Sequence, residues 1–239
     1  QYPAMPVLAL GVRSTMDGSA AKEAGDTDEA GELLNRGREV LKLLLEREGL
    51  TDDVGAKGLY YLGLAYYFLD RPFDAAIYLV QAASEHPDRP IAEQAVQYGY
   101  HLAQAVYQAA SDDQRAIQLY EQAAATLLDE FSMLDLAEDQ RYAFAAFLAE
   151  QNRYADAVEQ YEQVREDSEF YVNAQYERLV SLHNLWLTAA SESAGDLIKR
   201  NLMAADQARD VIEQALRNAT GDRAQQLKQM LGDTLVMKA

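Results

Sequence analysis

The stretch from Ala56 to Arg89 constrains the fold more than any other part of the chain, because it has the pattern of two short helices joined by a tight turn. Apolar residues recur at helical spacing on both sides of Asp70-Arg71-Pro72, and proline suits the first turn of a helix. Pro87 and Pro90 end the second helix, since proline disfavours helix at the preceding residue. One such hairpin cannot bury its own apolar face, so the sequence predicts similar hairpins stacked beside it.

Large, small and aromatic residues follow one another in a fixed order through this hairpin. The expected packing residues are Leu62, Gly63, Tyr66, Ala75 and Ala82. Their order resembles the tetratricopeptide repeat, with leucines in place of the usual tryptophan and the later phenylalanine. The resemblance implies that Gly63 and Ala75 are small because the two helices cross there. It also implies that Ala82 leaves room for the next hairpin.

The same skeleton recurs along the chain with a period of 41 residues, so that Ala116 and Ala157 occupy the position of Ala75. We expect repeats over residues 56–89, 97–130 and 138–171, a degenerate repeat over 179–212, and capping helices over 27–48 and 222–237. Residues 1–25 are rich in proline, glycine, serine and alanine, and are predicted to form an extended arm. The expected fold is therefore all-α, a right-handed superhelical solenoid of about ten helices in one continuous domain over residues 26–239.

The resemblance also implies a binding surface, since proteins of this family generally hold a peptide or protein segment in the concave groove lined by the first helix of each hairpin. In this chain the groove would be lined by Tyr60, Leu64, Tyr67, Tyr98, His101 and Tyr142. Tyrosine is a favoured interface anchor, because it buries a large area and keeps a polar tip. The subfamily that clamps a terminal carboxylate has basic and asparagine residues at these positions, so we do not expect that type of binding.

The net charge limits the class of partner. The chain carries 21 Lys and Arg against 39 Asp and Glu, a formal net charge of -18. Nucleic-acid binding draws most of its affinity from clustered basic residues, so a nucleic-acid partner is not expected, and a neutral or basic protein is favoured. Residues 199–239 differ, with seven Lys and Arg against five Asp and Glu, or +2. The chain has no run of eighteen apolar residues, so no membrane span is predicted.

Motifs for catalysis or cofactor binding are absent from the sequence. The chain has no cysteine, its three histidines lie far apart, and no glycine-rich phosphate loop occurs. Trp186 falls on an apolar stripe with Leu182 and Leu185 and is expected in the core. We therefore predict a non-enzymatic protein-binding scaffold with no metal and no cofactor. The alternatives are a self-assembly module that pairs through its end helices, or the repeat region of a larger multidomain or envelope protein. The start at Gln1 slightly favours a secreted or periplasmic location.

Overall fold

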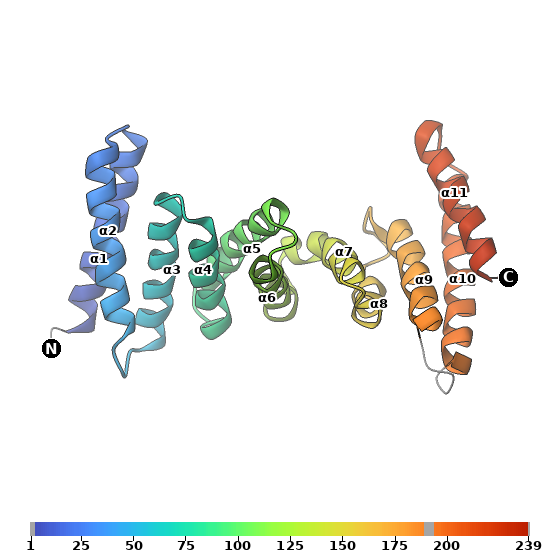
Figure 1. Cartoon of the computed structure of the whole chain (residues 1–239), viewed down its shortest axis with the longest axis horizontal. Coiled ribbons are helices and arrows are strands. Elements are labelled where there is room, and N and C mark those ends of the chain that lie inside the picture. The colour runs from blue at the N-terminus through green and yellow to red at the C-terminus, as the bar shows by residue number, and fades with distance from the viewer. Residues whose placement is uncertain (1–2, 189–193, 239) are drawn as a thin grey trace. The chain divides into compact units, whose positions relative to one another are not determined.

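A computed structural model describes residues 3–188 and 194–238 of the chain (Figure 1). These residues form eleven helices and no strand, which confirms the expected all-helical class of fold. The chain divides into two compact units, Gln1–Ser132 (unit 1) and Met133–Ala239 (unit 2). This differs from the single continuous domain that the repeat pattern led us to expect.

Within each unit, consecutive helices pack against each other as hairpins. The helices of unit 1 are α1 (Ala4–Glu23), α2 (Thr27–Leu45), α3 (Asp52–Phe68), α4 (Pro72–Glu85), α5 (Ala92–Ala109) and α6 (Gln114–Glu130). Those of unit 2 are α7 (Asp135–Glu150), α8 (Tyr154–Glu162), α9 (Tyr171–Thr188), α10 (Ala194–Leu216) and α11 (Gly221–Lys238).

The 41-residue period of the sequence is visible in where the second helix of each hairpin begins. Helices α4, α6, α8 and α10 start at residues 72, 114, 154 and 194. The small residue expected at each crossing is buried, since Ala75 and Ala157 are 0% exposed and Ala116 is 1% exposed. The remaining expected packing residues, Leu62, Gly63, Tyr66 and Ala82, are buried as well. The equivalent position of the fourth repeat, 41 residues after Ala157, is Ile198, a larger residue that is 42% exposed.

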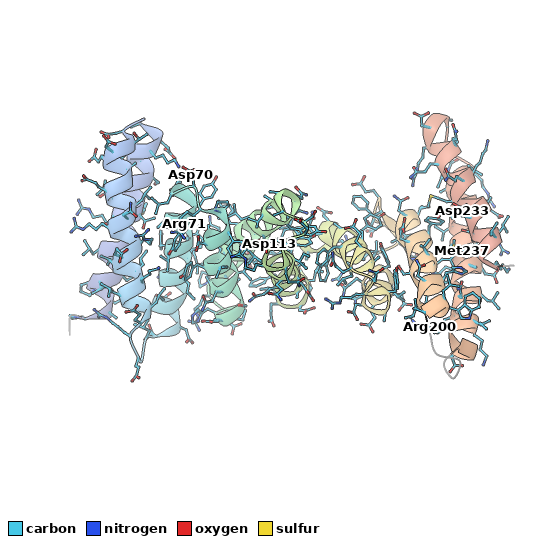
Figure 2. All side chains as sticks on the ribbon, in the orientation of Figure 1. Asp70, Arg71, Asp113, Arg200, Asp233 and Met237 are labelled. Carbon is cyan, nitrogen blue, oxygen red and sulfur yellow. The ribbon has the colours of Figure 1, made fainter. Side chains whose placement is uncertain are left out.

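The tight turns inside the hairpins repeat at the same period. Asp70, labelled in Figure 2 at the turn between α3 and α4, has a φ of 57°, and Asn152, between α7 and α8, has a φ of 59°. These two residues are twice the sequence period apart. The left-handed conformation is more accessible to Asp and Asn than to other residues with a side chain, because their short polar groups bond locally. The residue types at these two positions therefore explain why both turns have the same backbone conformation.

The amino-terminal segment is helical, so the expectation of an extended arm over residues 1–25 is wrong for its described part. Helix α1 buries Leu8, Gly11, Ser14, Thr15 and Gly18, which are spaced for one helical face. A Cβ on Gly18 would lie 2.8 Å from Cγ of Leu34 on α2, so the absence of side chains lets the two helices approach closely. The small residues that resemble a loop in sequence are the packing face of this helix.

The amino-terminal helix is also tied to the hairpin that follows. The ammonium group of Lys22 donates hydrogen bonds to the carbonyl oxygen of Phe68, at 2.6 Å, and to Oδ2 of Asp70, at 2.8 Å. Because the last carbonyls of a helix have no partner within the helix, Lys22 satisfies one of them at the end of α3. Helix α1 thus supports the helix that contributes half of the lining of the pocket described next.

Candidate partner-binding groove

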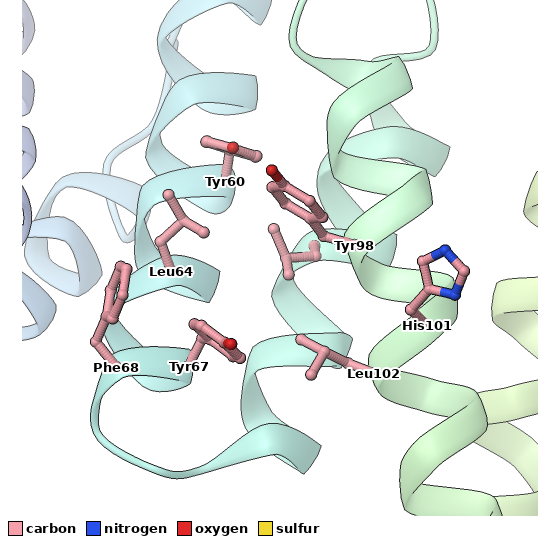
Figure 3. A pocket seen from close by; sticks show the side chains of 8 residues that line it. Tyr60, Leu64, Tyr67, Phe68, Tyr98, His101 and Leu102 are labelled. Atoms are coloured by element: carbon pink, nitrogen blue, oxygen red, sulfur yellow. The ribbon is translucent and has the colours of Figure 1, made fainter. Parts of the chain in front are cut away.

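A pocket of about 450 Å³ opens in unit 1 between α3, α4 and α5 (Figure 3). Helix α3 contributes four residues, α4 one and α5 three. The lining residues are Tyr60, Leu64, Tyr67, Phe68, Leu79, Tyr98, His101 and Leu102. Five of the six residues expected in the groove therefore surround one pocket.

The inner part of the pocket is formed by buried side chains. Leu79 is 0% exposed and Tyr60 is 4% exposed, so both are held by the packing of the hairpins. Burial raises the pKa of Tyr60 to about 12, and the neighbouring hydroxyls of Tyr98 and Tyr61 add to that rise. The Tyr60 hydroxyl therefore stays protonated at any physiological pH and can donate a hydrogen bond.

The rim of the pocket is formed by two tyrosines that are half open to solvent. Tyr67 is 49% exposed and Tyr98 is 45% exposed. Tyr67 meets Phe68 edge to face at 5.3 Å between ring centroids, and Gln94 donates a long hydrogen bond of 3.4 Å to the Tyr98 hydroxyl. In Figure 3 the side chains of Tyr60 and Tyr98 lie on facing helices across the pocket. A partner could therefore bury both rim rings without unfolding any part of the unit.

The chemistry of the lining favours an apolar anchor. None of the lining residues is Asp, Glu, Lys or Arg, and His101 is the one titratable group besides the tyrosines. A large apolar side chain of a partner would gain the hydrophobic free energy of burial in this pocket. The tyrosine hydroxyls could then bond the partner's backbone at the rim.

Tyr142 lies elsewhere, in unit 2, and is not part of this pocket. Its ring is stacked on Phe170 at 5.1 Å and tilted against Tyr161 at 5.8 Å. Burial, followed by the nearby charge of Glu177, raises the pKa of Tyr142, while a hydrogen bond with Asn173 opposes that rise. The aromatic residues named together by the sequence pattern are thus separated into two units.

Three lining residues lie beyond the six groove residues named from the sequence above. Phe68 and Leu102 follow from helical spacing, because each lies four residues after a residue of the groove face, Leu64 and Tyr98. Leu79 is 0% exposed in the core of the hairpin and also lines the pocket.

Within residues 3–188 and 194–238, no group of three or more His, Asp and Glu side chains is placed to hold a metal ion. None of the described helices is both long enough and apolar enough to cross a membrane.

Stacked helical hairpins are typical of helical-repeat proteins, and the expectation is confirmed at that level. The family model that matches the chain is that of the soluble NSF attachment protein, SNAP, over residues 25–232. The chain belongs to this family. The tetratricopeptide repeat itself is not the family that matches, and no curated protein matches the chain.

Proposed function

We propose that this protein is a non-enzymatic scaffold that binds a segment of another protein in the aromatic pocket of unit 1. The single observation that carries the proposal is the pocket itself, with a buried floor at Tyr60 and Leu79 and an exposed rim at Tyr67 and Tyr98. Exposed tyrosines around an apolar pocket are typical of binding hot spots. The family's name, an attachment protein, agrees with a role in holding another protein. The hairpin from residue 56 to residue 89 would pack in the manner of a tetratricopeptide repeat.

The charge of unit 1 favours a neutral or basic partner. Residues 1–132 contain ten Lys and Arg against 21 Asp and Glu, a net charge of -11. A field of this sign raises the rate at which a basic segment encounters the unit, and the effect weakens with salt. The apolar pocket would then supply the affinity, and the surrounding charge the steering.

The test uses the exposed rim, because substitution of the buried Tyr60 would also disturb folding. In a Tyr67→Ala, Tyr98→Ala variant we expect the dissociation constant for a captured partner to rise by roughly 10- to 100-fold, the loss typical of hot-spot tyrosines. Partners are captured from lysate of the source cell with the parent chain and measured by isothermal titration calorimetry. Leu43→Ala is the matched control, since Leu43 is 59% exposed on α2 and lies outside the pocket. Equal affinity of all three chains would remove the pocket from the binding surface.

A second candidate function is self-association through the amino-terminal helix. Met5, Leu10 and Met16 on α1 are 58%, 41% and 56% exposed, which leaves apolar surface at the start of unit 1. Multi-angle light scattering over a hundredfold range of concentration separates the two functions. A scaffold for other proteins is expected to keep the mass of 26.6 kDa throughout, whereas self-association would give a mass that rises with concentration.

A further inference from the structure

Unit 2 contains a second pocket, of about 380 Å³, between the last three helices. Its lining residues are His183 and Trp186 from α9, Ile198, Asn201 and Leu202 from α10, and Met237 and Lys238 from α11. Figure 2 labels Met237 on α11. Trp186 is half-buried and faces this pocket, which differs from the full core position expected from its apolar stripe.

One lining residue has a buried hydrogen-bond acceptor that is unpaired within the described part of the chain. Asn201 is 6% exposed, and its Oδ1 has no hydrogen-bond partner among the described residues. Its Nδ2 lies 3.5 Å from Nδ1 of His183, which is at the far limit of a hydrogen bond. A buried acceptor left unpaired costs about 1–3 kcal/mol, and most buried polar groups in proteins are paired.

The other lining residues determine the shape of a ligand group that could donate a hydrogen bond to Asn201. The rings of His183 and Trp186 lie 5.5 Å apart at 52°, and Ile198 and Leu202 add aliphatic surface. The ammonium group of Lys238 is already paired with Asp206, so none of the described lining residues is a free Lys or Arg for an anionic ligand. A flat apolar group with a single hydrogen-bond donor would contact these apolar side chains and pair with Oδ1 of Asn201.

We propose that this pocket takes a tryptophan or tyrosine side chain of a partner protein, with the ring beside Trp186 and its N–H or O–H donating to Oδ1 of Asn201. The apolar surface around the pocket favours a polypeptide over a free small molecule. Ile198 and Leu202 are 42% and 41% exposed, and the adjacent Met203 is 72% exposed. A single ring inside the pocket would leave that rim in water, whereas a protein segment would cover it.

The charge on helix α10 indicates which residues flank the aromatic side chain. Lys199 and Arg200 follow Ile198 in sequence but do not line the pocket, and their side chains are 78% and 51% exposed. Their ion pairs are long, 3.7 Å to Asp196 and 3.9 Å to Glu162, and such exposed pairs contribute little. Acidic residues beside the aromatic anchor would complement this surface. The partner of unit 2 therefore has the opposite charge preference to the partner proposed for unit 1.

The chain offers a built-in reporter for this pocket, because Trp186 is its only tryptophan. In a ¹⁵N–¹H spectrum of the labelled full chain, the single indole N–H signal belongs to Trp186. We expect unlabelled indole to shift this signal in a saturable way. Benzofuran has the same shape but no donor, and it should bind roughly 2- to 10-fold more weakly, the value of one hydrogen bond. Equal affinities of the two probes, or an unmoved signal, would overturn the proposal without the need for any variant.

Variants and peptides complete the test. Asn201→Leu should abolish the preference for indole over benzofuran, while Tyr98→Ala, which alters the pocket of unit 1, should leave that preference unchanged. The capped peptide Asp-Trp-Asp is expected to bind at least as tightly as indole and more tightly than Lys-Trp-Lys. Binding of indole without binding of either peptide would mean that the pocket takes a free small molecule. A tighter fit of the lysine peptide would contradict the acidic flank.

Discussion

Replacing Gly63 with leucine is expected to lower the free energy of unfolding by about 3 kcal/mol, because α3 and α4 cross at this glycine with no room for a side chain. A Cβ at Gly63 would lie 2.7 Å from Cγ of Leu79 and 3.2 Å from the carbonyl oxygen of Ala75. Leu79 is fully buried and cannot swing away into solvent. The backbone of Ala75 can move only if the two helices separate, which would open the core of the hairpin.

Urea unfolding followed by far-ultraviolet circular dichroism measures this loss. Gly31→Leu is the matched control, since Gly31 is also helical and a Cβ there would meet nothing within 4 Å. Because leucine favours helix more than glycine does, the control should be as stable as the parent or up to about 1 kcal/mol more stable. An unchanged unfolding midpoint for Gly63→Leu would mean that the helices cross elsewhere than the repeat pattern implies.

The hairpins could be predicted from the sequence because their determinants are local. Gly63 and Ala75 mark a helix crossing by their size, and Asn152 marks a tight turn by its tolerance of positive φ. Both signals depend on steric rules that act over a few residues. They recur at the period of the repeats and can therefore be recognised in the sequence. The pocket of unit 1 follows in part, since Tyr60 and Tyr67 lie on one face of one helix.

Features that depend on a partner element were not visible in the sequence. Gly11, Ser14 and Gly18 resemble a loop by composition, and only the nearness of α2 makes them a packing face. Trp186 was expected in the core because it lies on an apolar stripe. Such a stripe does not show whether a neighbouring helix covers the side chain fully. The division into two compact units at residue 132 is not marked in the sequence, because the period of the repeats continues across that residue.

Raising the pH from 8 to 11 is expected to lower the free energy of unfolding by roughly 3–4 kcal/mol through three buried tyrosines. Tyr60, Tyr100 and Tyr161 are 4%, 0% and 1% exposed, and burial raises the pKa of each, to about 12 for Tyr60 and further for the other two. In the unfolded chain these hydroxyls lose their protons near pH 10. Above that pH the unfolded state binds fewer protons than the folded state, so stability falls as the pH rises, by about 1 kcal/mol for each tyrosine at pH 11.

Tyr100→Phe separates this effect from the general repulsion in a chain of charge -18. At pH 8 the variant should be about 1 kcal/mol less stable than the parent, because the Tyr100 hydroxyl lies 3.2 Å from that of Tyr120 in the core. At pH 11 that deficit should vanish, since the variant has no buried hydroxyl at position 100 to keep protonated. Tyr67→Phe, at a half-exposed ring, is the control and should follow the parent at both pH values. A deficit of Tyr100→Phe that is the same at pH 8 and pH 11 would show that general charge repulsion, and not burial of this hydroxyl, governs the alkaline loss.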